Sequence, residues 1–191
     1  MFFDVSKYSL FKEEAEDPAA EEGSSIAAEV AELLNAQIVN EFYSAYLYLD
    51  MANYYRDIAL DGFANYFEVQ AHEEMDHGMM FRKYLIDNNV KVVFDAIKKP
   101  DKVYDDLHQP LEAALEHEKL VTGMINTIYE AAHKTNDFKT MEFLDWFVKE
   151  QVEEEKTADD LIKRANLFSH GSNGLFGLDK ELSERKYEPV Q

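Results

Sequence analysis

The chain has 191 residues, enough for one domain with a substantial core, and no cysteine, which excludes disulfide bonds and thiolate metal sites. Its formal net charge of −20 disfavours nucleic-acid binding and favours a high local concentration of cations, although acidic faces also simply keep a protein soluble. Because the chain has neither a long apolar run nor a basic, apolar leader, we expect a cytoplasmic protein without a membrane segment.

Residues 1–25 differ in composition from the rest of the chain. The stretch "KEEAEDPAAEEGSS" is polar and acidic, as in a flexible linker. We expect residues 1–25 to be a flexible acidic extension or an appended segment, with a docking peptide for a partner protein as the alternative. The folded domain is then expected at residues 26–186, followed by a short tail at 187–191. A small apolar cluster precedes the linker: Phe2, Phe3, Val5, Tyr8, Leu10 and Phe11.

Four long segments with helical periodicity follow, and a shorter fifth ends the domain. Ser24 or Ser25 is the expected N-cap of the first helix, and "DNN" is expected to end the second. The third is expected to start near Asp105 or Asp106, with Pro110 tolerated in its first turn. The other predicted helices span about 25–56, 60–88, 137–166 and 173–185.

The connections between these segments predict the topology. Short turns join the first pair and the second pair, so each pair should form an antiparallel hairpin. The 17 residues "NVKVVFDAIKKPDKVYD" can extend about 55 Å, more than the length of a 28-residue helix, about 42 Å. We therefore predict an all-α four-helix bundle with one long crossover. An up-down bundle with a loose loop is the alternative, but the apolar "VKVVF" favours a packed crossover.

One face of each predicted helix is apolar except near its middle, where a glutamate interrupts it. The four faces are Leu34, Ile38, Glu41, Ala45, Tyr48 and Ala52; Phe63, Phe67, Gln70, Glu74, His77, Phe81 and Tyr84; Leu111, Ala114, Glu118, Val121, Ile125 and Ile128; and Leu144, Phe147, Gln151, Glu154, Ala158 and Leu161.

A single glutamate on such a face is usually an edge residue, but four at similar heights indicate a shared cause. Each unpaired ionised carboxylate in a core costs several kcal/mol. The faces carry no lysine or arginine, so bound cations are the expected compensation. Two divalent metals would balance four glutamates, and His77 adds a neutral nitrogen ligand one turn from Glu74. Carboxylates with one imidazole suit iron or manganese, and zinc can also occupy such a site.

These residues resemble those of the non-haem ferritins of bacteria and archaea. The matching stretches are "NEFYSAYLYLDMA", "QAHEEMDH", "EHEKLVT" and "FLDWFVKEQVEEE", and the likeness covers about residues 26–186. The resemblance implies a ferroxidase centre with two irons. Glu41, Glu74 and His77 would bind one iron, with Glu74 bridging to the second. Glu118 and Glu154 would hold the second iron, with Gln151 close by.

Further site residues follow from the same resemblance. Tyr48 would hydrogen-bond a ligand and supply an electron, with plain core packing as the alternative. Glu73, Glu150 and Glu153 would form a third iron site, with a solvated acidic face as the alternative. Trp146 is expected to pack in the aromatic core.

Two related groups fit the sequence less well. Bacterioferritins carry Glu-x-x-His on the fourth helix as well and bind haem through a methionine. Here the fourth helix reads "EQVEEE" without histidine. Met75 occupies a position like that methionine, but non-haem ferritins also carry it, so no haem is expected. Mini-ferritins place their ligands between subunits, whereas this chain has a complete set within one bundle.

The resemblance implies an iron-storage ferritin that oxidises Fe²⁺ with O₂ or peroxide and keeps Fe³⁺ as a mineral inside a shell of 24 subunits. Two alternatives remain open. One is a di-metal oxidase or peroxidase of the ferritin-like group that stores nothing. The other is a cage scaffold that presents the N-terminal peptide to a partner protein.

Overall fold

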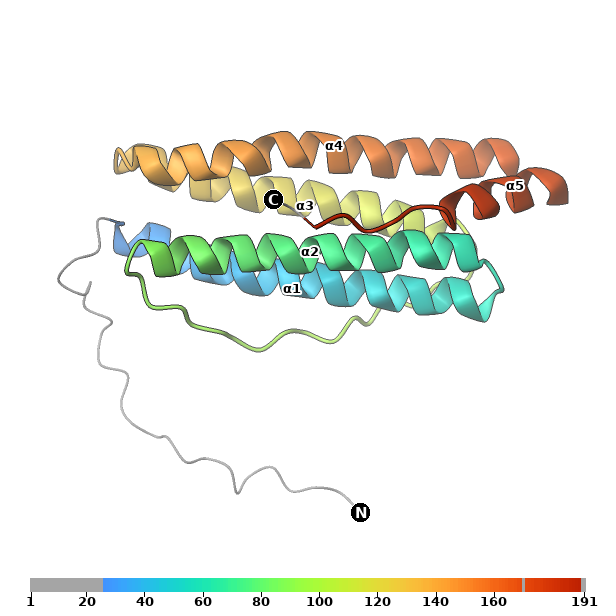
Figure 1. The fold of residues 1–191 in the computed structure, drawn as a ribbon, viewed down its shortest axis with the longest axis horizontal. Helices are drawn as coiled ribbons and strands as arrows, with labels where there is room; N and C mark the ends of the chain where they lie inside the picture. The colour runs from blue at the N-terminus through green and yellow to red at the C-terminus, as the bar shows by residue number, and fades with distance from the viewer. Residues whose placement is uncertain (1–25, 170, 190–191) are drawn as a thin grey trace, which may run out of the picture.

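The computed structural model describes residues 26–169 and 171–189 and contains five helices in this part of the chain (Figure 1). No strand occurs among these residues. The all-α prediction is therefore confirmed. The expectation for residues 1–25 lies outside the described residues. The helices are α1 (Ala28–Asp57), α2 (Asp61–Asp87), α3 (Gln109–Lys134), α4 (Phe138–Phe168) and α5 (Ser172–Leu182).

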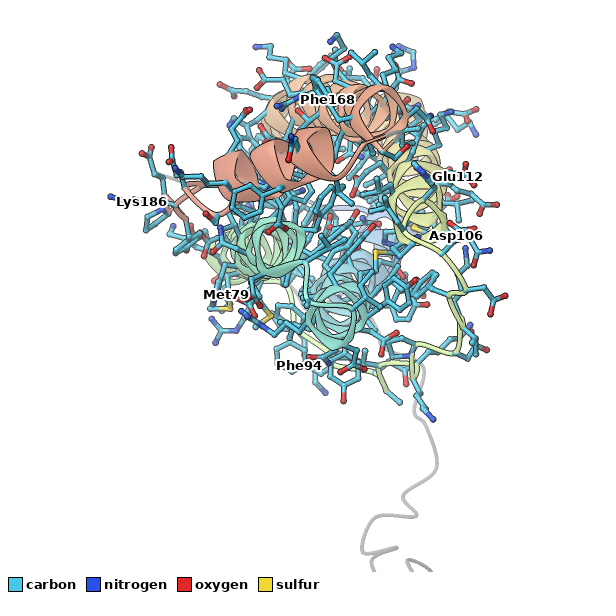
Figure 2. All side chains as sticks on the ribbon, turned by 90° about the vertical axis from the view of Figure 1, so that its right-hand side faces the viewer. Met79, Phe94, Asp106, Glu112, Phe168 and Lys186 are labelled. Atoms are coloured by element: carbon cyan, nitrogen blue, oxygen red, sulfur yellow. The ribbon has the colours of Figure 1, made fainter. Side chains whose placement is uncertain are left out.

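The four long helices form a bundle, and the chain crosses it once along its length (Figure 1). The α1–α2 and α3–α4 connections are short, and each of these pairs is antiparallel. Residues 88–108 run from the end of α2 to the opposite end of the bundle, where α3 begins. The end-on view shows the four helices around a common core, with α5 lying across them (Figure 2). The predicted crossover topology is confirmed.

Two helix starts differ from the prediction. The N-cap of α1 is Ala27, which makes no side-chain capping bond, so a serine cap at residue 24 or 25 is wrong. Helix α3 begins at Gln109 rather than at Asp105 or Asp106. The reason is that the Asp106 carboxylate accepts the backbone N–H groups of His108 and Gln109, at 2.8 and 3.1 Å, and so holds a turn before the helix.

The end of α2 agrees with the prediction. Asn88 is the C-cap, and Asn89 adopts a positive φ of 56°, the left-handed conformation that asparagine tolerates. Pro110 lies in the first turn of α3, where its missing N–H removes no helical hydrogen bond.

The predicted faces meet in the core. Every residue of the four faces is buried except Tyr84, which is half-buried and shares a hydrogen bond with the Thr140 hydroxyl. The buried apolar residues divide into two clusters. One contains Ala45 and Ala114, the other Ile38 and Val121. On each helix the glutamate falls between members of the two clusters, so a polar layer separates two apolar ones.

The crossover is less buried than the apolar "VKVVF" predicts. Val93 and Phe94 are 53% and 59% exposed, although Val90 and Val92 pack partly against the core. The Asn35 side chain holds the segment through its backbone instead. Its oxygen accepts the N–H of Val93 at 2.7 Å, and its amide donates to the Lys91 carbonyl at 3.2 Å. Tyr104 and Leu107 also pack partly against the core at the other end of the segment. The expectation of a packed crossover is therefore correct at its two ends and wrong at Val93 and Phe94.

Helix α5 contacts α2 and α4 and caps the beginning of α2. The Asp179 carboxylate accepts the N–H groups of Gly62 and Phe63, at 2.8 and 3.0 Å, which lack partners within their own helix. Gly62 permits this close approach, because a Cβ there would lie 1.6 Å from the Asp179 carbonyl oxygen. Among the described residues, no helix combines the length and apolar character needed to cross a membrane.

Candidate metal centre

Each helix of the bundle contributes one buried carboxylate to the polar layer. Glu41, Glu74, Glu118 and Glu154 are only 1–7% exposed. The sequence predicted all four as metal ligands, and that role stays a prediction, whereas their burial on the inner faces is observed. Their side chains face inward because each lies on the apolar face of an amphipathic helix, so packing of the neighbouring turns fixes the direction in which they point.

Glu41, Glu74 and His77 form the tightest group of metal-ligating side chains. One ligand atom from each lies within 4.8 Å of the others. His77 Nδ1 is 3.6 Å from a Glu74 oxygen. Glu41 Oε2 and His77 Nε2 are buried and have no hydrogen-bond partner, while Gln37 donates to the other Glu41 oxygen at 2.9 Å. Two buried ligand atoms are thus left free to bind a cation.

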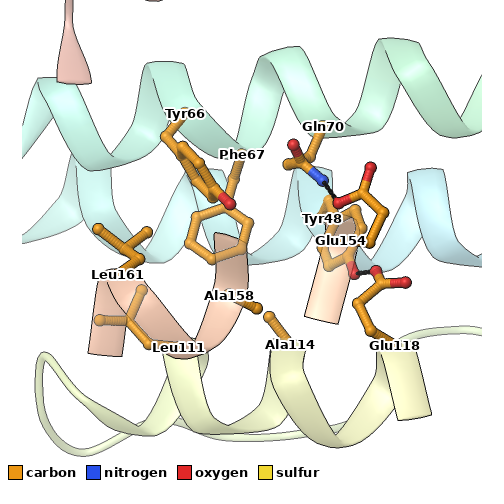
Figure 3. A pocket seen from close by; sticks show the side chains of 10 residues that line it. All are labelled: Tyr48, Tyr66, Phe67, Gln70, Leu111, Ala114, Glu118, Glu154, Ala158 and Leu161. Carbon is orange, nitrogen blue, oxygen red and sulfur yellow. Dashed lines mark hydrogen bonds between the residues drawn. The ribbon is translucent and has the colours of Figure 1, made fainter. Parts of the chain in front are cut away.

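Glu118 and Glu154 form the second half of the layer, beside Tyr48 (Figure 3). The Tyr48 hydroxyl donates to one Glu118 oxygen, and the Gln151 amide donates to the other at 3.2 Å. Gln70 donates to Glu154 at 2.8 Å. These bonds orient carboxylates from α3 and α4 without supplying positive charge.

Gln70 is a residue to which the sequence analysis gave no role. Its polar side chain interrupts the apolar face of α2 one turn before Glu74, and that interruption was the available signal. A cavity of about 10 Å³ lies beside it, room for about one water molecule (Figure 3). Its lining includes Tyr48, Glu118 and Glu154 and an apolar wall of Phe67, Leu111, Ala114, Ala158 and Leu161.

No lysine or arginine among the described residues forms an ion pair with the four inward glutamates. Burial, and then the Glu74 carboxylate, raises the pKa of Glu41 to about 8. Burial, followed by the charges of Glu118 and Glu154, raises the pKa of Glu74 well above its usual range.

The pKa values of Glu118 and Glu154, in the other half of the layer, are raised as well. Burial, and then the charge of Glu118, raises the pKa of Glu154 to about 7. Burial also raises the pKa of Glu118, against the hydrogen bonds from Tyr48 and Gln151. Without metal, the layer therefore holds protons that bound cations would displace.

The donor set suits divalent iron. Carboxylate oxygens and one imidazole nitrogen, with no thiolate, bind Fe²⁺, Mn²⁺ or Zn²⁺. Ferritin-like di-metal bundles use a glutamate from each of two helices and Glu-x-x-His from the others. Here α1 and α3 supply the single glutamates and α2 supplies Glu74-x-x-His77, whereas α4 carries Gln151-x-x-Glu154. The donor set therefore fits divalent metal, and Glu41, Glu74 and His77 already lie close enough together to bind one ion.

The three carboxylates expected to hold a third iron lie on the outer side of the layer. Glu73 and Glu150 are half-buried and Glu153 is exposed. They do not form a second close group of ligand atoms within the described ranges. They do interact electrostatically, because the charges of Glu153 and Glu73 add to burial in raising the pKa of Glu150. Their role as a metal site stays a prediction.

Two other residues singled out in the sequence lie at the edge of the centre. The Trp146 ring packs edge-on against Phe147 and His77, with centroids 4.8 and 5.4 Å apart. This position agrees with an aromatic packing role beside the imidazole. Met75, by contrast, is exposed on α2.

Comparisons with known proteins agree with this geometry. The family model for the ferritin-like domain matches residues 31–168. A probable bacterial non-heme ferritin-like protein of Haemophilus influenzae is 36% identical over 157 residues, 82% of this chain and 95% of that protein. The bacterial non-heme ferritin of Campylobacter jejuni is 34% identical over 155 residues, 81% and 93% of the two chains.

The solved structures that resemble this chain are also ferritins. A closed form of the Archaeoglobus fulgidus ferritin, engineered by mutagenesis, superposes with a TM-score of 0.84 at 40% identity, over 86% of this chain and all of that one. An open-pore ferritin from the same archaeon superposes with a TM-score of 0.82 at 40% identity, over 84% and 98% of the two chains.

Proposed function

The chain belongs to the ferritin family, and on this premise we propose that it stores iron after oxidising Fe²⁺ at a two-iron centre inside the bundle. One observation carries the proposal. Four carboxylates, one from each long helix, are buried together with His77, and no lysine or arginine of the described residues pairs with them. Divalent iron is the substrate whose charge and ligand preference complete this arrangement.

The protein contributes binding, charge balance and orientation. Glu41, Glu74 and His77 hold the first Fe²⁺; Glu118 and Glu154 hold the second, with Glu74 reaching both. Binding releases the protons that burial retains on the carboxyl groups. The two Fe²⁺ ions supply the electrons that reduce O₂ or peroxide, and Fe³⁺ then leaves for the mineral.

The neighbouring polar side chains set the ligand geometry. Tyr48 and Gln151 each donate to one Glu118 oxygen, and Gln70 donates to Glu154. Such partners restrict the rotation of a ligating carboxylate, so iron enters a partly preorganised site. Tyr48, whose hydroxyl donates to Glu118, is also proposed to supply an electron through that ligand.

Storage requires an enclosing assembly as well as the centre. We propose a homo-oligomeric shell of 24 subunits, as the family implies, in the cytoplasm. Glu73, Glu150 and Glu153 are proposed to bind a third iron beside the centre. Residues 1–25 are proposed as an extension to the domain at 26–186, and a docking role for them would add a partner protein without changing the iron chemistry.

Aerobic addition of Fe²⁺ to the purified, metal-free full chain tests the proposal. We expect a fast rise in ferric absorbance that saturates with the number of subunits, followed by slower uptake into a soluble core that co-elutes with the protein. Fast oxidation with iron precipitating outside the protein would favour a non-storing oxidase. Oxidation no faster than in buffer would contradict the two-iron centre.

A further inference from the structure

The seven residues that follow α5, here called the C-terminal strap (residues 183–189), run back along α2 toward the middle of the bundle (Figure 1). The Asn65 amide donates to the carbonyls of Leu182 and Arg185, both at 3.0 Å. Farther along, the Tyr187 hydroxyl donates to Asp76 at 2.6 Å, and its ring lies 5.1 Å from that of His72. Several turns of α2 therefore hold the strap in place.

Arg185 places its guanidinium on one of the outer carboxylates. Its Nη2 donates to a Glu73 oxygen at 2.6 Å, and its Nη1 donates to the Tyr66 carbonyl at 3.5 Å. The guanidinium carbon lies 4.7 Å from the centre of the Tyr66 ring, in a cation–π contact. Figure 2 shows the next strap residue, Lys186, beside α2 at the edge of α5. The strap thus brings positive charge to the layer's outer side.

This ion pair differs from the other arginine and lysine pairs of the described chain. The side chains of Arg185 and Glu73 are 28% and 20% exposed, whereas every other such pair is more exposed on both sides. Partial burial reduces the screening of this attraction by water. Tyr66 adds a third contact that fixes the guanidinium.

The position of Glu73 gives the pair a consequence for metal binding. Glu73 immediately precedes the inward ligand Glu74, and it is one of the three carboxylates proposed to bind a third iron. The guanidinium occupies one Glu73 oxygen that a metal ion could otherwise use, and its positive charge repels a cation at the other oxygen. The Arg185 contact therefore disfavours a metal ion at Glu73.

We propose that Arg185 is a resident cation that keeps the outer carboxylates closed to a third metal ion until the strap releases Glu73. The inference rests on the proposed function, because it assigns a control to the outer side of the same centre. Thermodynamic coupling acts in both directions, so a metal ion that binds Glu73 also weakens the binding of the strap to α2. Arg185 is accordingly a positioning residue that sets metal occupancy, and it touches no reacting atom.

Zn²⁺ titration of the assembled, metal-free full chain by calorimetry tests this inference, since Zn²⁺ is redox-inert. We expect two tight ions per subunit in the parent. In Arg185→Ala we expect a third ion to bind at least about tenfold more tightly than in the parent, as loss of a charge-assisted bond implies. Arg185→Lys keeps a cation at Glu73 and should stay close to the parent.

Two further variants separate local competition from general effects. Arg164→Ala removes a similar arginine pair, with Glu181 at 2.6 Å, away from Glu73, and should leave the third ion weak. Adding Glu73→Gln to Arg185→Ala should abolish the third ion again. Thermal unfolding and gel filtration of each variant check that fold and assembly persist.

Three outcomes would overturn the inference. In the first, Arg185→Ala matches the parent, with two tight ions in both. In the second, Arg185→Lys or Arg164→Ala gains the third ion as strongly as Arg185→Ala, which would show that a cation at Glu73 is not what keeps the third ion out. Absence of tight Zn²⁺ binding in the parent would instead remove the proposed two-metal centre, and the inference with it.

Discussion

The inner and outer carboxylates of the same layer balance their charge in different ways. The inner group, Glu41, Glu74, Glu118 and Glu154, is buried, and among the described residues its neighbours are hydrogen-bond donors, His77 and the other inner carboxylates, with no lysine or arginine. The outer group begins one residue away, at Glu73, and there the chain supplies its own cation, Arg185.

The difference separates a binding site from a structural ion pair. A buried carboxylate without a cation destabilises the metal-free fold when it ionises, and a bound metal ion offsets that cost. A half-buried carboxylate paired with a guanidinium already has a cationic partner, so a bound metal ion stabilises it less. Glu73 and Glu74 are adjacent in α2 but differ in environment, because consecutive residues of a helix point about 100° apart.

The largest effect is expected from replacing an inner ligand that reaches both metals. Glu74→Gln keeps the shape but removes the charge, so we expect the initial rate of O₂-dependent Fe²⁺ oxidation to fall at least about 100-fold, beyond the loss typical of outer-shell changes. Stopped-flow absorbance measures the rate. Glu68→Gln on the same helix, which loses only the exposed pair with Arg56, should match the parent. Equal oxidation rates for Glu74→Gln and the parent would contradict the role of Glu74 as an inner metal ligand.

The inner group should also make the metal-free protein less stable as pH rises. The folded-state pKa of Glu41 is about 8 and that of Glu154 about 7, against 4.5 when unfolded. Between pH 4.5 and those values the folded state holds more protons, so the free energy of unfolding falls as pH increases, by about 1.4 kcal/mol per pH unit for each proton.

Thermal unfolding with a chelator at pH 6 and pH 8, at constant protein concentration, measures this trend. We expect the parent to melt lower at pH 8, and Glu41→Gln to show a smaller difference between the two pH values. Added Zn²⁺ should reverse the trend, because metal binding takes over the charge balance. A metal-free parent more stable at pH 8 than at pH 6 would contradict the account.

The outer region depends on the docking of α5, which Gly62 makes possible. Gly62→Ala would place a Cβ 1.6 Å from the Asp179 backbone, so we expect it to displace α5 and destabilise the fold by about 2–3 kcal/mol. Gly123→Ala is the matched control. Nothing lies within 4 Å of a Cβ there, and a gain of about 0.5–1 kcal/mol is expected inside a helix. Urea unfolding compares the two variants, and equal effects would show that the α5 contact is weak.

The smallest effect is expected from a single donor to an inner ligand. Tyr48→Phe removes the hydroxyl that donates to Glu118 but leaves the Gln151 amide. We expect Fe²⁺ oxidation to slow by about five- to tenfold while the number of Zn²⁺ ions bound stays the same. Tyr55→Phe, which loses a hydroxyl bonded to the Leu107 carbonyl at 2.7 Å, should leave the rate unchanged. Identical rates in both variants would reduce Tyr48 to a packing role.

The sequence predicted the inner region well because the signal is periodic. A glutamate on an apolar helical face is visible wherever the helix is long, so the positions of Glu41, Glu74, Glu118 and Glu154 followed directly. The bundle topology also followed, since the length of the crossover limits where the third helix can begin.

The sequence named the outer carboxylates but not their contacts, because these contacts join residues far apart in the sequence. Nothing local to Arg185 indicates that it reaches Glu73, or that Asp179 caps α2. The start of α3 was misplaced for a local reason, as Asp106 holds a turn that resembles a helix start. The apolar residues of the crossover suggested burial, but Asn35 fixes that segment through its backbone.

The position of bound metal tests the central claim most directly. Anomalous diffraction from crystals of the full chain loaded with Zn²⁺ or Fe²⁺ locates each ion. The account predicts two peaks inside the bundle, one bound by Glu41, Glu74 and His77 and one by Glu118 and Glu154. Peaks confined to the outer carboxylates, or none within the bundle, would contradict it.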